Sequence, residues 1–171
     1  KAAYLSRLFI KRNADVHIIL TQNGARFITP LTFESLTGTK CLTDTFDRNF
    51  EFDIKHISIA KKADLFVVAP ASADIIGKIA GGIADDMLST TIMAAVCPKI
   101  IVPAMNTNML HNSIVQENIE KLKRHNYKII APERGLLACK DVGDGKFPEP
   151  EVILEYALYE IAKNKDMKGK K

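Results

Sequence analysis

The sequence predicts a three-layer α/β domain, in which a mostly parallel, doubly wound sheet of the Rossmann or flavodoxin-like type is covered by helices on both faces. Two observations support this fold class. Short β-branched runs alternate with helical stretches along the chain, as in parallel α/β sheets. The runs are continuously apolar, which is typical of strands buried on both faces. The 171 residues suffice for one domain with a sizeable core.

Four apolar runs are the predicted strands. In chain order they are DVHIIL (15–20), ADLFVVAP (63–70), KIIVP (99–103) and YKIIAP (127–132). A further short strand is expected near Cys41. The last three runs end in proline, which cannot donate a hydrogen bond to a ladder, so each strand is expected to stop there.

Helices are predicted between these strands. The helical stretches are residues 1–14, 72–83, 86–96, 113–125 and 150–162, with a shorter one directly after His56. Ser113 is the expected N-cap of its helix, and Pro150 begins the last helix. Because such a domain usually opens with a strand, we expect that a first strand and its turn lie upstream of this chain.

Composition excludes several classes of protein. Hydrophobic residues make up 47% and charged residues 26% of the chain, and no apolar run approaches the ~18 residues of a membrane span. The net charge of +4 resides in residues 163–171, whose five Lys and one Asp leave the remainder neutral. The body of the domain therefore gives no electrostatic reason to expect nucleic-acid binding. Three cysteines and four isolated histidines lack disulfide or metal spacing, which indicates a reducing compartment such as the cytoplasm.

Polar side chains follow the ends of the predicted strands. Ligands of open α/β sheets bind beyond the carboxyl ends of the strands, so the sequence predicts a pocket there. The candidates are Ser72, Asp74, Asn106, Asn108, Glu133 and Arg134.

Several candidate residues allow two interpretations. His56 precedes a helix, whose dipole favours a neutral imidazole that can accept a proton; the alternative, which this local context favours, is a surface or capping residue. Asn106 and Asn108 either tie up a loop or contact a ligand. Asp85 and Asp86 are either N-caps or catalytic carboxylates.

Cys139 lies in the segment RGLLACKDVGDGKF (134–147). The glycines of this segment predict a mobile flap rather than a core element. The Cys139 thiol, beside Lys140 and Asp141, is either accessible and chemically used or has no role in chemistry. Cys41 and Cys97 lie in apolar settings and are predicted to be inert.

Three segments together resemble one family. They are HISIAKKADLFVVAPASADIIGKIAGGIADDMLSTT (56–91), PAMNTNM (103–109) and LLACKDVGDGKFPEP (136–150). In this order and spacing they resemble the flavin-dependent cysteine decarboxylases, and within that family the phosphopantothenoylcysteine decarboxylases of coenzyme A biosynthesis. The similarity spans nearly the whole chain.

This resemblance implies an FMN-dependent reaction on 4′-phosphopantothenoylcysteine. The substrate thiol is oxidised to a thioaldehyde, CO2 leaves as electrons flow into the C=S group, and the enethiol is reduced to 4′-phosphopantetheine. It also implies that His56 is the base, that Asn106 binds the substrate carboxylate, and that Cys139 donates a proton in the reduction. Met105 and Ala138 are expected beside the substrate.

The resemblance also implies the residues around FMN. They are Thr21, Gln22, Asn23, Ser72, Ala73, Asp74 and Ala104. Two positions depart from the family pattern. The motif often reads Ala-Asn-Thr where this chain has Ala-Asp-Ile (73–75), although bacterial bifunctional members also carry Asp. The family usually has Gly where this chain has Lys140.

The tail KDMKGKK (165–171) resembles the junction to a CTP-dependent phosphopantothenate–cysteine ligase in bacterial bifunctional proteins. We therefore expect a flavin-binding decarboxylase domain over residues 1–162 and a linker over 163–171. Family members imply a homotrimer or a multiple of it, such as a dodecamer, with FMN at subunit interfaces. The alternatives are a peptidyl-cysteine decarboxylase, which lacks the reductive cysteine, a flavin prenyltransferase and a non-catalytic regulatory flavoprotein.

Overall fold

The computed structural model describes the backbone of residues 1–45 and 55–168 and the side chains of residues 1–45 and 57–163. Its central sheet consists of β1 (Phe66–Ala71), β2 (Lys99–Pro103) and β3 (Lys128–Ile129), in the order β1-β2-β3. All pairings are parallel, with Val67 opposite Ile100 and Ile101 opposite Ile129. The predicted parallel sheet is therefore confirmed.

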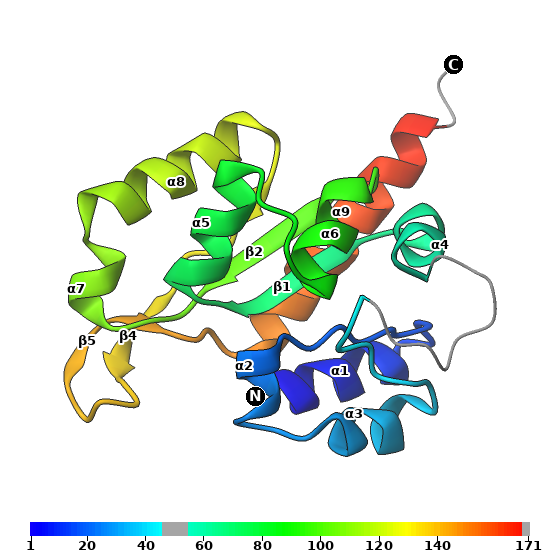
Figure 1. The fold of residues 1–171 in the computed structure, drawn as a ribbon, viewed down its shortest axis with the longest axis horizontal. Helices are drawn as coiled ribbons and strands as arrows, with labels where there is room; N and C mark the ends of the chain where they lie inside the picture. Colours follow the sequence, from blue (N-terminus) through cyan, green and yellow to red (C-terminus); the bar gives the residue numbers. More distant parts are fainter. Residues whose placement is uncertain (46–54, 169–171) are drawn as a thin grey trace.

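Helices cover both faces of this sheet (Figure 1). One face carries α4 (Lys55–Lys62), α5 (Ala73–Gly81), α6 (Met87–Ala94) and α8 (Ser113–Arg124), and the other carries α1 (Ala2–Lys11) and α9 (Pro150–Lys168). Three further helices, α2 (Gln22–Ala25), α3 (Pro30–Thr37) and α7 (Thr107–Leu110), were not predicted. The three layers agree with the predicted fold class.

Alternate residues of β2 divide the core into two clusters. Ile101 packs among the side chains of α5, α6 and α8, whereas Ile100 and Val102 pack against α1 and α9. All three side chains are fully buried. The strand is thus apolar on both faces because both faces are covered, as its sequence predicted.

The predicted strand at 15–20 is reduced to a single bridge, between Ile19 and Leu42. The strand expected near Cys41 is the other side of that bridge. The Leu42 N–H and C=O bond to Ile18 and Leu20, so the next rung of a parallel ladder would use the Val16 carbonyl. That carbonyl accepts the Thr39 hydroxyl at 3.3 Å instead. Competition from this side chain explains why a β-branched run yields no regular strand here.

Proline ends β2 as predicted but does not end β1. β1 passes through Pro70 to Ala71 with a register irregularity after Val68, and the Ala69–Pro70 peptide is cis. An irregular register accommodates the missing donor of Pro70 inside the strand. β3 ends earlier than its prediction, at Ile129.

Capping residues explain the helix boundaries. Asn112, and not the predicted Ser113, caps α8, because its side chain accepts the Ile114 N–H at 3.0 Å. Asp86 caps α6 in a capping box with Ser89, which confirms the N-cap interpretation of this residue. α9 continues to Lys168, beyond the predicted end at 162, since no glycine or proline interrupts the sequence before Gly169.

The predicted flap is an antiparallel hairpin of β4 (Glu133–Leu136) and β5 (Val142–Lys146). It lies beside α7 at the end of the sheet where β2 finishes (Figure 1). In the described part of the chain, we find no helix with the length and apolar character that a membrane span requires.

Candidate functional site

The carboxyl ends of the strands bring the predicted site residues to one edge of the sheet. β1 leads into Ser72 and α5, β2 leads into residues 104–106 and α7, and the chain after β3 enters the hairpin. The two neighbouring loops touch, because the Ala104 N–H donates to the Ala71 carbonyl at 3.1 Å. Topology thus builds this edge from segments that are far apart in the sequence.

Asn106 holds its amide in a defined orientation. It is the N-cap of α7, and its Oδ1 accepts the Asn108 N–H at 2.9 Å. Its Nδ2 is therefore the end that faces the hairpin, where it lies 3.7 Å from the Cys139 Sγ. Asn106 accordingly presents a hydrogen-bond donor to a ligand at this edge.

Cys139 occupies the tip of the hairpin. The turn closes with two hydrogen bonds, from the Lys140 N–H to the Leu137 carbonyl at 2.9 Å and from the Leu137 N–H to the Asp141 carbonyl at 2.8 Å. Cys139 is exposed, and its thiol donates to the Asp141 carboxylate at 3.4 Å. A reactive group at a hairpin tip can meet a ligand bound at the sheet edge.

Lys140 has a left-handed backbone, with φ of 69°. A three-residue hairpin loop of this kind needs a residue with positive φ at its third position, where glycine is preferred. Glycine, which the resemblance leads us to expect at this position, would meet this requirement without strain. The lysine keeps the loop geometry in the structure at the expense of some backbone strain.

The other two predicted substrate residues lie on either side of this contact. Met105 is half-buried and packs against the larger core cluster, while its N–H donates to the Gly145 carbonyl at 3.1 Å. Ala138 is exposed in the turn, next to Cys139. Met105 therefore belongs partly to the core and partly to the wall of the site.

The predicted cofactor residues cap two helices. Thr21 caps α2 by accepting the Gly24 N–H at 3.0 Å, and Ser72 caps α5 by accepting the Ile75 N–H at 3.4 Å. The residues that follow these caps are Gln22, Asn23, Ala73 and Asp74. Each capping hydroxyl keeps its own O–H as a donor, and the first N–H groups of α5 have no partner within the helix. This edge therefore suits a cofactor rich in hydrogen-bond acceptors.

His56 is the second residue of α4. Its side chain lies outside the described residues, so its predicted role as a base stays a prediction.

Burial separates the remaining cysteines from Cys139. Cys41 and Cys97 are 4% and 7% exposed. Burial raises the pKa of the Cys41 thiol to about 11, and the nearby Glu34 carboxylate adds to the increase. Cys139 is thus the cysteine that a ligand or reagent can reach.

The sequence did not single out Asp144, Thr107 or His111 as site residues. The Thr107 hydroxyl donates to the Asp144 carbonyl at 2.8 Å, and the His111 Nε2 lies 3.1 Å from the Asp144 Oδ2. The only sequence signal was the spacing of the glycines on either side of Asp144. Glycines placed in this way indicate a close approach of two backbones.

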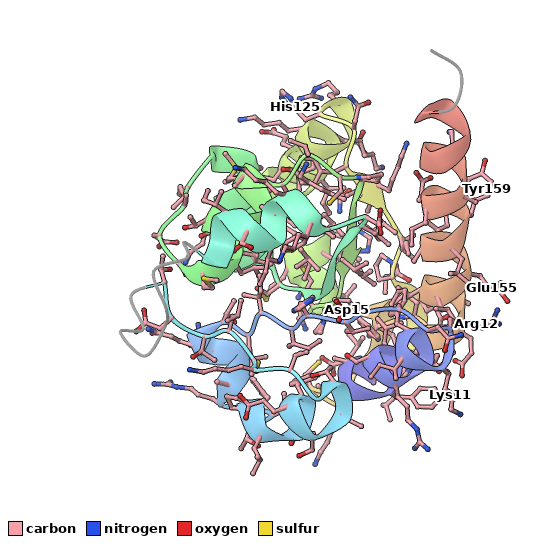
Figure 2. All side chains as sticks on the ribbon, turned by 90° about the vertical axis from the view of Figure 1, so that its right-hand side faces the viewer. Lys11, Arg12, Asp15, His125, Glu155 and Tyr159 are labelled. Carbon is pink, nitrogen blue, oxygen red and sulfur yellow. The ribbon has the colours of Figure 1, made fainter. Side chains whose placement is uncertain are left out.

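A separate cleft of about 370 Å³ lies at the opposite end of the sheet, where His125 marks its position in Figure 2. Its lining includes Lys99, Tyr127, Lys128 and Glu160, and none of the predicted site residues. The candidate site therefore rests on the contacts at the carboxyl edge and not on this cleft.

Known proteins resemble the chain over nearly its full length. The sequence profile of the family described as Flavoprotein matches residues 1–161. The coenzyme A biosynthesis bifunctional protein CoaBC of Bacillus subtilis is 45% identical over 157 residues, which are 92% of this chain and 39% of that protein. The chain thus spans about two fifths of the length of the curated relatives that it matches.

Solved structures share the fold. A PPC decarboxylase mutant complexed with pantothenoylaminoethenethiol superposes with a TM-score of 0.81 at 29% identity, covering 91% of this chain and 87% of that one. The FMN-dependent cysteine decarboxylase SpaF gives a TM-score of 0.80 at 27% identity, covering 94% and 89%.

Proposed function

Because the chain belongs to the flavoprotein family, we propose that it is an FMN-dependent carboxy-lyase that converts 4′-phosphopantothenoylcysteine to 4′-phosphopantetheine in coenzyme A biosynthesis. The observation that carries this proposal is the 3.7 Å approach of the Asn106 Nδ2 to the Cys139 Sγ. These two residues are expected to hold the substrate carboxylate and to donate a proton. The names of the bifunctional relatives and of the decarboxylase structures agree with this reaction.

The residues at the carboxyl edge fit FMN. Hydroxyls of Thr21 and Ser72, the amides after Thr21 and the first N–H groups of α5 offer donors to a phosphate or to the ring carbonyls. Ala104 offers a small apolar contact beside them. When bound, FMN would accept the electrons of the substrate thiol and return them in the reductive step.

Asn106 is suited to hold a carboxylate that is about to leave as CO2. Its Nδ2 donates, since its Oδ1 is engaged by the Asn108 N–H. A neutral amide orients a carboxylate without the ion pair that an arginine would form. A weaker ground-state interaction with the carboxylate leaves a lower barrier to its loss.

Cys139 is suited to deliver a proton. Its Sγ lies 3.4 Å from the Asp141 carboxylate, an acceptor toward which the thiol hydrogen can point. Because Cys139 is exposed, solvent can restore the proton after each turnover. His56, at the start of α4, is the proposed base for the oxidation.

The same family supports a proposed assembly. We propose residues 1–162 as the decarboxylase domain, residues 163–171 as the link to a ligase domain, and a homotrimer or its multiple as the oligomer, with FMN at subunit interfaces.

Replacing Asn106 tests the reaction. Loss of a hydrogen bond to a charged group lowers kcat/KM roughly 10- to 150-fold, so Asn106→Ala should release CO2 from 4′-phosphopantothenoylcysteine that much more slowly in FMN-loaded protein. Asp86→Ala is the matched control, because it removes the helix cap of α6, which belongs neither to α7 nor to the hairpin. Wild-type rates in Asn106→Ala, or FMN-loaded wild-type protein that releases no CO2, would refute the proposal.

A further inference from the structure

A single residue of the hairpin contacts both ends of α7. The first residue of α7, Thr107, donates from its hydroxyl to the Asp144 carbonyl at 2.8 Å. The residue that ends α7, His111, places its Nε2 3.1 Å from the Asp144 Oδ2. Thr107 and His111 are four residues apart and therefore share one face of the helix.

Two glycines permit this close approach. The ladder pairs Lys146 with Glu133 and Asp144 with Arg134, so Gly145 is an extra residue in a β-bulge. Its carbonyl leaves the ladder and accepts the Met105 N–H at 3.1 Å. A Cβ at Gly145 would overlap the Met105 carbonyl oxygen, and one at Gly143 would overlap the Thr107 hydroxyl.

These contacts connect directly to the two proposed catalytic residues. Asn106 immediately precedes Thr107, and Cys139 lies at the tip of the hairpin that contains Asp144. The turn at the tip is itself closed by the hydrogen bond between the Leu137 N–H and the Asp141 carbonyl. Fixing Asp144 on α7 therefore also fixes where the tip lies relative to Asn106.

The His111–Asp144 pair is not a device for global stability. Its side chains are 59% and 48% exposed, and exposed ion pairs add little to the free energy of unfolding. Its position between α7 and the hairpin indicates a local structural role instead. Removing the pair should leave the fold intact, so its role can be tested by mutation.

We propose that His111 and Asp144, together with Thr107, are positioning residues that hold the hairpin on α7 so that the Cys139 thiol stays beside the Asn106 amide. Their effect on turnover rests on the proposed function, whereas the closure of the hairpin is a property of the chain alone. The two parts can therefore be tested separately.

The first test measures amide hydrogen exchange in the intact, ligand-free protein. Each lost contact raises the open population of the hairpin by roughly 2- to 10-fold, the effect of one hydrogen bond. We expect such an increase over residues 133–146 and at the Met105 N–H in His111→Ala and in Thr107→Val, and a larger one in the double variant. Unchanged exchange in the double variant would overturn the proposal.

Two further variants control this test. His17→Ala removes another exposed histidine–aspartate contact, 3.2 Å from Asp15, and should leave hairpin exchange unchanged. His111→Gln keeps an N–H donor near the Asp144 carboxylate and should restore exchange to within about twofold of wild type. Equal exchange in His111→Ala and His111→Gln would mean that the hydrogen bond has no role.

The second test measures products with bound FMN. Because CO2 loss does not use the Cys139 thiol, the Thr107→Val/His111→Ala variant should make less 4′-phosphopantetheine per CO2 released. Faster amide hydrogen exchange with an unchanged product ratio would contradict the positioning role. If wild-type protein releases no CO2, the proposed function fails, and the exchange result alone decides whether these residues hold the hairpin on α7.

Discussion

The two halves of the candidate site are built differently. In the substrate half, the contacts between α7 and the hairpin join residues more than thirty positions apart, as between Asn106 and Cys139 or Thr107 and Asp144. In the cofactor half, Thr21 and Ser72 bond to backbone groups only three residues ahead. One half depends on tertiary structure, whereas the other consists of local helix caps.

This difference indicates which half is fixed before a ligand arrives. Long-range contacts and a glycine bulge hold Asn106 and Cys139 together in the chain alone. The two helix caps of the cofactor half have donors to spare but no contact described between them. Bound FMN would connect them through its own hydrogen bonds. A preorganised substrate half reduces the ordering that substrate binding requires.

Gly145→Ala should have the largest effect on stability. Its φ of 118° is strained for any residue with a Cβ, and that Cβ would meet the Met105 carbonyl. We expect a loss of at least about 2 kcal/mol in urea unfolding, together with loss of 4′-phosphopantetheine formation. Gly77→Ala in α5, which meets only a distant amide, should be neutral or stabilising by up to about 1 kcal/mol. Equal stability of the two variants would show that Gly145 does not pack closely against the Met105 backbone.

Ser72→Ala should have an intermediate effect, confined to the cofactor half. Loss of this N-cap should lower the free energy of unfolding by about 1 kcal/mol and weaken FMN retention. Asp86→Ala removes the cap of α6 and should destabilise similarly without loss of flavin. The ratio of flavin to protein absorbance distinguishes the two, and equal retention would remove Ser72 from the cofactor site.

Lys140→Gly should have a small effect in the opposite direction. Removing the strain of the left-handed backbone stabilises the folded state, whereas glycine gives the unfolded chain more freedom. The net result should be a free energy of unfolding that is higher by about 0.5 kcal/mol. The melting temperature should rise slightly while the product remains 4′-phosphopantetheine. A lower melting temperature would mean that the lysine side chain, and not the backbone, determines the stability of the turn.

The smallest effect at neutral pH concerns Cys41, outside both halves. Burial raises its pKa to about 11, whereas an unfolded thiol titrates near about 8.5. The folded state therefore holds this proton more tightly, so the stability that it contributes is complete below pH 8.5 and is lost as the pH rises toward 11. Melting temperatures should fall less steeply over this range in Cys41→Ala than in wild type, and identical slopes would contradict the assignment.

Much of the fold followed from local sequence patterns. Runs such as KIIVP are strands because both their faces are buried, and Pro103 ends its strand as predicted. The segment 15–20 is not a regular strand because the Thr39 hydroxyl takes the Val16 carbonyl that a longer ladder would need. Periodicity does not reveal a competing side chain from a distant part of the chain.

The candidate site was predictable to a similar extent. Motifs marked Asn106 and Cys139 but not their contact, and they missed Asp144 because its partners are on α7, more than thirty residues away. The short helix α7 and the bulge at Gly145 arise from tertiary contacts, so no local pattern specifies them.

The most direct test of the central claim is a single turnover of FMN-loaded Cys139→Ser with 4′-phosphopantothenoylcysteine. Oxidation and CO2 loss do not need this thiol, whereas a positioned general acid contributes about 10²- to 10⁴-fold to the reduction. A serine hydroxyl is a poor replacement because its pKa is far higher. We expect that CO2 is released, that the flavin stays reduced and that an enethiol accumulates. Formation of 4′-phosphopantetheine at the wild-type rate would contradict it.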